Sequence, residues 1–312
     1  MNNAAIVGAG LIGRSWANVF ARAGWNVRMW DPVPAQRAQA LKLVAQSLHD
    51  LARHGLVRDP EGAAQRVVVV GTLAEAVERA DYVQESGPET LEAKRATFAE
   101  LDAAAPAQAI LASSTSGIVA SKFTGELAGR ARCIVAHPVN PPHLAPVVEL
   151  CGAPWTSEAT RRRAREIMTA VGQAPVDVKR EVHGFILNRL QAALLTEAFR
   201  LVHEGYVDPE DLDRTIADGL GLRWAFMGPF ETIEMNAPGG IPDYCRRYVD
   251  LFRRCAADPA PASVWDEANW RQVSEAWPKP LDAARIAAKM LWRDERLAAL
   301  VAHKRAQPRS DT

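Results

Sequence analysis

A glycine triplet near the N-terminus limits most strongly what this chain can fold into. The stretch GAGLIG contains Gly8, Gly10 and Gly13. The apolar run Ala4–Val7 precedes the triplet, and a segment with helical spacing, Leu11–Ala23, follows it. Three glycines alone indicate no more than a tight turn. A strand, a glycine turn and a helix in this order predict a phosphate cradle, because free amides at the helix N-terminus face the charge.

Each position of the loop has its own part in such a cradle. Gly8 permits the tight turn, Gly10 lets the backbone approach a pyrophosphate closely, and Gly13 lets the helix pack against the strand. Leu11 and Ile12 belong to the first helical turn, whose amides are expected to face the phosphate.

An acidic residue follows the next predicted strand. The alternating segment Trp25–Trp30 ends at Asp31, about 18 residues after Gly13, near the interval at which a dinucleotide fold places an acid beside the ribose. A carboxylate accepts both ribose hydroxyls but repels a 2′-phosphate, and positions 32–36 hold no arginine that would offset the repulsion. Asp31 therefore favours NAD over NADP. The alternative for Asp31 is a cap or turn residue before Pro32.

Strand and helix signals alternate as far as residue 180. Further short apolar strands are predicted at residues 67–70, 82–85, 110–112, 133–136, 146–150 and 175–178. Such strands separated by helices predict an α/β fold with a Rossmann-type, doubly wound, mostly parallel sheet. Helical segments then dominate as far as Lys304. We predict an NAD-binding domain over residues 1–180 and an all-α substrate and dimerisation domain over residues 181–312.

Composition narrows the class of function. Basic and acidic residues number 37 each, so the balance favours neither nucleic acid nor an anionic membrane as a partner. The sequence shows no signal peptide and no apolar run of roughly 18 residues, which predicts a soluble, cytoplasmic protein. The four cysteines show no CxxC spacing, so neither a metal site nor a disulfide framework is predicted. A small-molecule substrate is expected.

The run IVAHPVNPPHLAPVVEL contains a candidate catalytic pair. His137 ends one predicted strand and Glu149 lies in the next. If these strands are neighbours, the carboxylate raises the proton affinity of the imidazole and fixes its tautomer. Such a general base is worth on the order of 10² to 10⁴ in rate when it removes a hydroxyl proton during hydride transfer to NAD. A structural histidine is the alternative for His137, and His143 receives no role.

Several blocks, in order, carry a resemblance to a known family. They are GAGLIG with Asp31, SSTSG at residues 113–117, AHPVNPP at 136–142, VVEL ending at Leu150, and GFILNRL at 184–190. On these blocks the chain resembles the L-3-hydroxyacyl-CoA dehydrogenase superfamily. The segments LVHEGYVDPEDLD and DGLGLRWAFMGPFETIEMN make it most similar to the lambda-crystallin branch, whose enzymatic members are L-gulonate 3-dehydrogenases. His183, just before GFI, departs from the usual family pattern.

The resemblance implies roles for individual residues. His137 would be the catalytic base, Glu149 its orienting carboxylate, and Asn188 a hydrogen-bond partner of substrate or histidine. Ser116 would touch the substrate hydroxyl and the nicotinamide end of the cofactor. Further contacts to NAD are implied for Glu89, Lys94 and Asn140. Taken alone, these side chains also fit a turn hydroxyl, a surface amide and an exposed ion pair.

Substrate choice is expected to involve Arg223, in the segment GLRWAF. A guanidinium grips a free carboxylate in bidentate fashion, and in this branch the segment comes from the partner subunit, so a homodimer is expected. The alternative is a surface arginine at a helix end. A CoA ester offers no free carboxylate, and residues 36–56 contain a single lysine, Lys42, where the CoA enzymes tend to carry several basic residues.

L-Gulonate is the expected substrate, oxidised at C3 with NAD. The runners-up are L-carnitine, 3-hydroxybutyrate and an L-3-hydroxyacyl-CoA. Trp224 and Phe226 could face the quaternary ammonium of carnitine, although such residues also serve as packed core. The competing class is a non-catalytic, crystallin-like protein that only binds NAD.

Overall fold

The computed structural model describes residues 2–277 and 282–307. The chain forms two compact units, one of Met1–Arg189 with Ala288–Thr312 and one of Leu190–Ala287. This division differs from the expected boundary near residue 180, because the end of the chain returns to the first unit.

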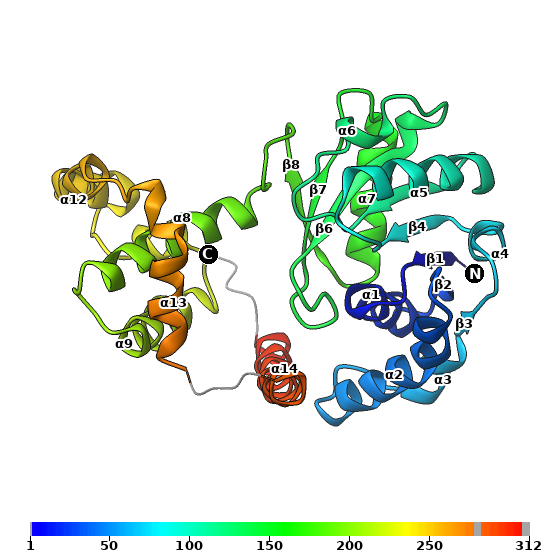
Figure 1. Cartoon of the computed structure of the whole chain (residues 1–312), viewed down its shortest axis with the longest axis horizontal. Helices are drawn as coiled ribbons and strands as arrows, with labels where there is room; N and C mark the ends of the chain where they lie inside the picture. The colour runs from blue at the N-terminus through cyan, green and yellow to red at the C-terminus, as the bar shows by residue number, and fades with distance from the viewer. Residues whose placement is uncertain (1, 278–281, 308–312) are drawn as a thin grey trace. The chain divides into compact units, whose positions relative to one another are not determined.

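The first unit is built on an eight-stranded sheet in the order β3-β2-β1-β4-β5-β6-β7-β8 (Figure 1). Its strands are β1 (Asn3–Val7), β2 (Asn26–Trp30), β3 (Val67–Val69), β4 (Tyr82–Glu85), β5 (Ile110–Ser113), β6 (Cys133–Pro138), β7 (Val147–Cys151) and β8 (Ala174–Val178). Every neighbouring pair is parallel except β6 and β7. The predicted Rossmann-type, mostly parallel sheet is confirmed.

Helices cover both faces of this sheet. One face packs against α1 (Leu11–Arg22), α2 (Pro34–Arg53), α3 (Pro60–Gln65), α7 (Glu158–Ala170) and α14 (Ala283–Ala306). The other face packs against α4 (Leu73–Val77), α5 (Leu91–Ala104) and α6 (Ser121–Thr124). The central strands are buried on both sides, which explains why they read as continuous apolar runs.

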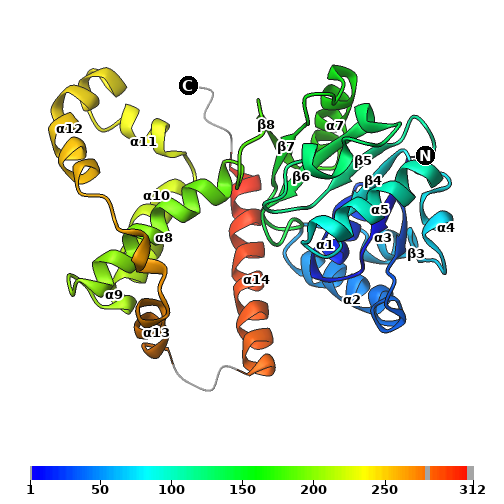
Figure 2. The same ribbon diagram turned by 45° about the horizontal axis from the view of Figure 1, so that its top comes forward.

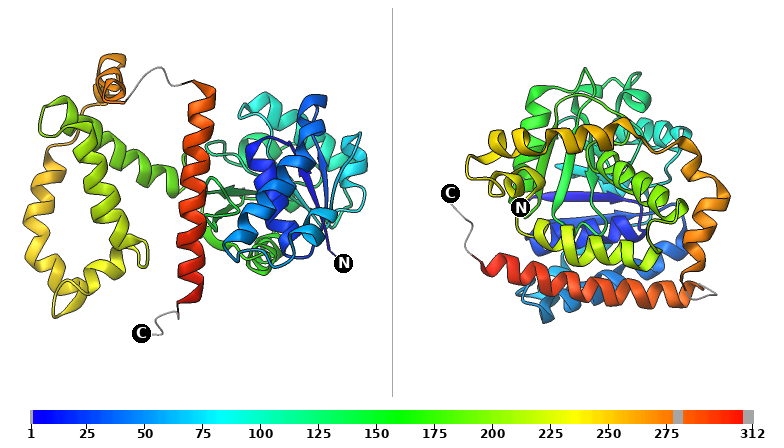
Figure 3. Two further views of the ribbon diagram at one scale, coloured as in Figure 1. Left: turned by 90° about the horizontal axis from the view of Figure 1, so that it is seen from below. Right: turned by 90° about the vertical axis from the view of Figure 1, so that its left-hand side faces the viewer.

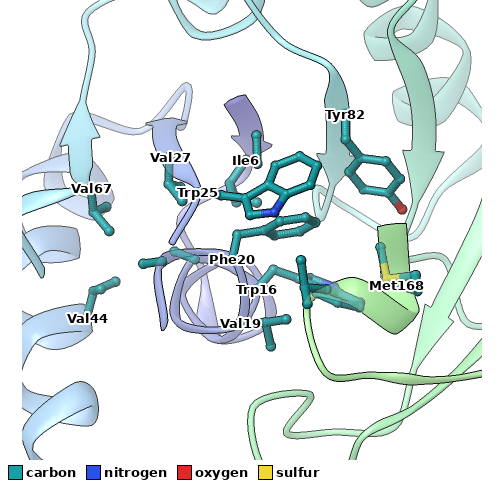
Figure 4. Close-up of a cluster of buried hydrophobic side chains, with 14 of the residues drawn as sticks. Ile6, Trp16, Val19, Phe20, Trp25, Val27, Val44, Val67, Tyr82 and Met168 are labelled. Atoms are coloured by element: carbon teal, nitrogen blue, oxygen red, sulfur yellow. The ribbon is translucent and has the colours of Figure 1, made fainter. Parts of the chain in front are cut away.

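Aromatic rings join α1 to the centre of the sheet (Figure 4). The Phe20 ring centroid lies 5.2 Å from that of Trp25, 5.4 Å from that of Tyr82 and 6.1 Å from that of Trp16. Phe20 is fully buried, and a side chain of this kind contributes about 3–5 kcal/mol to stability. This packing fixes α1 against β4 and thereby holds the glycine loop at the carboxyl edge of the sheet.

The last helix completes the same core. Leu297, Val301 and Ala302 of α14 pack against the cluster that contains Trp16, and Ala298 is buried within it. Figure 2 shows α14 along its full length. The expected boundary placed this helix in the second domain, because helical spacing alone does not say which core a helix covers.

The second unit is helical in its described residues, as predicted (Figure 3). It contains most of α8 (Leu187–His203), followed by α9 (Pro209–Arg214), a π-helical turn (Thr215–Leu220), α10 (Gly221–Trp224), α11 (Pro229–Glu234), α12 (Gly240–Ala257), a 3₁₀ turn (Ala262–Trp265) and α13 (Glu267–Glu275). Its buried apolar side chains among the described residues are Val202, Ala237 and Val264. Across the parts of the chain that are described, no helix has the length and apolar character needed to cross a bilayer.

Candidate active site

The glycine loop connects β1 to α1, and its three glycines serve different ends. Gly8 has a φ of +108°, and a Cβ there would lie 2.6 Å from the carbonyl oxygen of Ser86. A Cβ on Gly13 would lie 1.8 Å from the carbonyl oxygen of Gly8, so both positions require glycine for the protein's own packing. A Cβ on Gly10 meets no atom of the described residues within 4 Å. The space beside Gly10 is therefore open to a ligand.

The start of α1 fits an anionic group beside this space. Gly10 is the N-cap residue and no side chain caps the helix, so the first-turn amides of Leu11 and Ile12 have no side-chain acceptor. The residues present therefore fit a dinucleotide diphosphate, which such a helix N-terminus binds through its amides.

Asp31 lies directly beyond β2 with its carboxylate fixed by two backbone donors. Its Oδ2 accepts the Ala9 amide at 2.7 Å, and its Oδ1 accepts the Val33 amide at 2.8 Å. The side chain is nearly buried at 8% exposure. Each oxygen keeps a lone pair, which fits the two hydroxyls of a ribose.

Two arginines near Asp31 were not singled out from the sequence. Arg37 donates to the carbonyl oxygen of Asp31 at 2.6 Å, and Arg14 donates to that of Ala9 at 2.7 Å. Burial lowers the pKa of Arg14, and the charge of Asp31 partly offsets this shift. Both guanidinium groups therefore stabilise the turn that carries Asp31. Arg37 lies one position beyond residues 32–36, the segment in which an arginine would be expected to offset the charge of Asp31, and this is why it was missed.

Glu89 anchors the segment that carries Ser116. One oxygen of Glu89 accepts the Thr115 hydroxyl at 2.5 Å and the amides of Ser116 and Gly117 at 2.9 and 3.0 Å. Its side chain is 45% exposed, and its other oxygen lies 3.8 Å from Lys94 Nζ. Whether it also contacts NAD stays a prediction.

Lys94 forms the ion pair with Glu89 that its sequence position allowed, but the lysine is buried. Its side chain is 1% exposed, and its Nζ lies 2.8 and 2.9 Å from the two carboxylate oxygens of Glu85. The Ser113 hydroxyl donates to the same carboxylate at 2.6 Å, and Glu89 lies 3.8 Å from Nζ. Lys94 thus joins α5 to the ends of β4 and β5. Its predicted contact with NAD stays a prediction.

His137 and Glu149 lie directly opposite one another on the antiparallel strands β6 and β7. His137 Nδ1 is 2.8 Å from Glu149 Oε2, and both side chains are buried. The other oxygen of Glu149 accepts the amides of Ile186 and Leu187 at 2.8 and 2.9 Å. The expected pairing of imidazole and carboxylate is therefore present.

The surroundings of Glu149 keep it ionised. Burial raises its pKa, but the hydrogen bond from His137 and those from the amides of Leu187 and Ile186 outweigh burial, so the pKa lies below its usual value. An ionised Glu149 accepts the Nδ1 proton and leaves Nε2 of His137 as the proton acceptor.

A strained turn delivers the two amides to Glu149. Phe185 has a φ of +49°, in the left-handed region that a bulky side chain rarely adopts. Its buried ring lies against the imidazole, with ring centroids 5.4 Å apart. Phe185, Ile186 and Leu187 were missed from the sequence because the donors are backbone amides, which no side-chain pattern reveals.

The side chain of Asn188 is hydrogen-bonded to the backbone of Ser116. Asn188 lies at the start of α8, and its side-chain Nδ2 donates to the backbone carbonyl oxygen of Ser116 at 2.7 Å. Asn188 follows Leu187, so one short segment contacts both Glu149 and the Ser116 turn. The proposed substrate contacts of both side chains stay predictions.

The contacts described above do not include the remaining candidates. Asn140 is exposed before the cis bond to Pro141, and Arg223 is exposed on α10 in the second unit; their roles stay predictions.

His143 is buried, and its Nδ1 has no hydrogen-bond partner among the described residues. Burial together with the charges of Arg22 and Arg293 lowers the pKa of His143 to about 4, so it is neutral near pH 7.

Two protein-family models together match most of the chain. The NAD binding domain of 3-hydroxyacyl-CoA dehydrogenase matches residues 3–182, and the C-terminal domain of the same enzyme matches residues 184–266. The chain belongs to the 3-hydroxyacyl-CoA dehydrogenase family. It is therefore an NAD-dependent oxidoreductase, and the family, the enzyme class and the cofactor predicted from the sequence are confirmed.

Individual relatives support the lambda-crystallin branch within this family. Lambda-crystallin of Oryctolagus cuniculus is 42% identical over 305 residues, which cover 96% of this chain and 95% of the relative. An L-carnitine dehydrogenase of Streptomyces griseus subsp. griseus is 43% identical over 239 residues, which cover 76% of this chain and 70% of that enzyme. Among solved structures, 5-formyl-3-hydroxy-2-methylpyridine 4-carboxylic acid 5-dehydrogenase, an NAD+-dependent dismutase, has a TM-score of 0.86 at 27% identity and covers 99% of this chain and 100% of its own.

Proposed function

We propose that this enzyme oxidises the 3-hydroxyl of a free L-3-hydroxy acid, with L-gulonate as the substrate. The observation that carries the chemistry is the His137–Glu149 pair, in which the carboxylate is held by two backbone amides. A structural protein that only binds NAD has no use for a buried, oriented imidazole of this kind.

His137 acts as the general base in this proposal. Its Nε2 accepts the proton of the substrate hydroxyl, and Glu149 stabilises the imidazolium that forms. NAD, when bound, supplies the acceptor for the hydride that leaves C3. Ser116 and Asn188 hold the hydroxyl near Nε2, since the Asn188 amide fixes the turn that carries Ser116.

A free acid is favoured over a CoA ester by the basic residues of the chain. The CoA enzymes tend to carry several basic residues on this helix. Here α2 has a single lysine, Lys42, while Arg37 is bound to the carbonyl oxygen of Asp31 and Arg53 is paired with Asp50. Arg223 can grip a free carboxylate, which a thioester lacks. The L-gulonate assignment follows from the resemblance to the lambda-crystallin branch, whose enzymatic members oxidise that acid.

A substrate panel tests the assignment. The purified chain is assayed for NADH formation with L-gulonate, L-3-hydroxybutyrate, L-carnitine and L-3-hydroxybutyryl-CoA at equal concentrations. We expect the highest kcat/KM with L-gulonate, and Arg223→Ala to raise KM for L-gulonate with little change in kcat. A higher kcat/KM for the CoA ester would overturn the free-acid assignment.

L-Carnitine is the second candidate substrate. The aromatic side chains of Trp224 and Phe226 are 39% and 54% exposed, and an aromatic face binds a quaternary ammonium. The L-carnitine dehydrogenase relative is consistent with this reading. If carnitine is the substrate, Trp224→Ala lowers kcat/KM for carnitine and leaves that for 3-hydroxybutyrate unchanged.

We also propose that the enzyme is a homodimer in which Arg223 of one copy reaches the active site of the other. Tyr244, Tyr248, Leu251 and Phe252 form an apolar stripe at helical spacing on α12, and no residue of that helix is buried. An exposed stripe of this kind marks a protein interface.

All four cysteines are free thiols, which supports a reducing compartment such as the cytoplasm.

A further inference from the structure

Ser86 occupies the point at which the strand order of the sheet reverses. It follows β4 directly, and its amide donates to the carbonyl oxygen of Val7, at the end of β1, at 2.7 Å. The sheet order changes direction between β1 and β4. Ligands of open α/β sheets bind in the crevice at such a point. The Ser86 carbonyl also borders Gly8 of the glycine loop.

The Ser86 side chain belongs to a polar network on the α1 face of the sheet. The Tyr82 hydroxyl donates to Gln84 Oε1 at 2.9 Å, and Gln84 Nε2 donates to Ser114 Oγ at 2.7 Å. Trp16 Nε1, on α1, donates to the same Ser114 oxygen at 3.1 Å. Ser86 Oγ lies 2.9 Å from Ser114 Oγ. The network therefore ends at Ser86, at the carboxyl edge of the sheet.

The direction of the hydrogen bonds follows from which groups can only donate or only accept. Gln84 Nε2 also lies 3.3 Å from the carbonyl oxygen of Ala136, which only accepts, so the amide orientation is fixed. The indole of Trp16 only donates. Ser114 Oγ thus accepts two hydrogen bonds, which fills both of its lone pairs. Its own proton is then the one shared with Ser86.

Ser86 consequently accepts from Ser114 and keeps its own hydroxyl proton to donate. No described residue accepts that proton: the Ser86 side chain has Ser114 as its single hydrogen-bond partner in the part of the chain that the structure describes. Ser86 is half-buried, so its hydroxyl remains accessible from the crevice.

We propose that Ser86 binds the cofactor by donating this proton to an oxygen of NAD between the diphosphate and the nicotinamide ribose. The open space at Gly10 and the uncapped start of α1 place the diphosphate beside the glycine loop. Asp31 marks the adenosine half on the β2 side of β1, whereas Ser86 lies on the β4 side. The acceptor therefore belongs to the half of the dinucleotide beyond the adenosine.

Calorimetric titration of Ser86→Ala tests this assignment without relying on turnover. The full chain is titrated with AMP, ADP-ribose and NADH. We expect about 3- to 10-fold weaker binding of ADP-ribose and of NADH, the loss of one hydrogen bond. Binding of AMP, which ends before the proposed acceptor, stays within twofold of the wild type. The melting temperature falls slightly, because Ser114 loses the acceptor of its proton, so the AMP titration is the control for an intact glycine loop.

Tyr82→Phe is the matched control. It removes a hydroxyl from the buried end of the same network, so it lowers the melting temperature but leaves the affinity for all three ligands unchanged. Equal affinities of Ser86→Ala and wild type would show that the proton goes to water and would overturn the proposal. Equal weakening of AMP, or weakening of NADH alone, would also overturn it, since the first indicates a displaced loop and the second an acceptor on the nicotinamide amide.

Discussion

The carboxyl edge of the sheet buries charged side chains, whereas the helix α12 exposes aromatic ones. At the sheet edge, charged groups such as Lys94, Glu85 and Glu149 are buried, and each has a hydrogen-bond partner within the first unit. On α12, in the second unit, Tyr248 and Phe252 are 40% and 51% exposed. The charged groups of the first unit therefore find their partners within it, whereas the exposed rings of α12 are the surface on which the proposed dimer depends.

Substitution of His137 should give the largest effect and tests the first half of this comparison. We expect His137→Ala to lower kcat on the order of 10² to 10⁴, because the variant has no group to accept the hydroxyl proton. NADH affinity, measured by fluorescence titration, should stay within twofold. The control is His49→Ala, since His49 is an exposed histidine that bonds to Glu61 on the protein surface. Unchanged turnover in His137→Ala would refute the role of this residue as the base.

A charge on the α12 stripe tests the second half. We expect Phe252→Asp to weaken the proposed dimer by about 2 kcal/mol, roughly 30-fold in the dissociation constant, because the carboxylate must be desolvated at an apolar interface. Sedimentation at several concentrations gives the constant. Arg253→Asp introduces the same group at the neighbouring position, outside the stripe, and should have little effect. A dimer equally stable in both variants would place the interface elsewhere.

The buried His143 provides a smaller, pH-dependent effect on stability. Its pKa falls to about 4 in the folded chain, below the value of about 6.5 in the unfolded chain. The unfolded chain therefore binds the proton first, so stability is complete above pH 6.5 and declines as the pH falls towards 4. Between pH 8 and pH 5 the loss from this group is about 2 kcal/mol.

His143→Gln should remove this contribution. Denaturant unfolding at pH 8 and at pH 5 is compared for the variant and the wild type. We expect a loss of stability on acidification that is smaller in the variant by about 2 kcal/mol. Equal losses in both proteins would mean that His143 is protonated in the folded state without cost.

The sheet and the glycine loop could be predicted because their signals are local. The apolar run that ends at Gly8 predicts a strand buried on both faces, the alternating segment that ends at Asp31 predicts one buried mainly on one face, and helical spacing predicts α1. The pairing of His137 with Glu149 was also predictable, since two successive strands each carry one of the partners. The antiparallel register that sets them opposite each other comes from the tertiary structure.

Other parts of the site depend on contacts that leave no pattern in the sequence. The partner of Lys94 is Glu85, which was not singled out, because a buried ion pair is chosen by the packing of α5 on the sheet. The amides of Ile186 and Leu187 are oriented by the left-handed conformation of Phe185. A phenylalanine gives no sign of that conformation in the sequence, whereas a glycine does.

The docking of α14 has a consequence for biosynthesis. Residues 297–302 cover the same aromatic cluster that Trp16 and Phe20 begin, although the whole helical unit of residues 190–287 lies between them in the sequence. While the chain emerges from the ribosome, that cluster stays partly uncovered until residue 302 has been made. The core of the nucleotide-binding unit is therefore completed only after the helical unit has been synthesised.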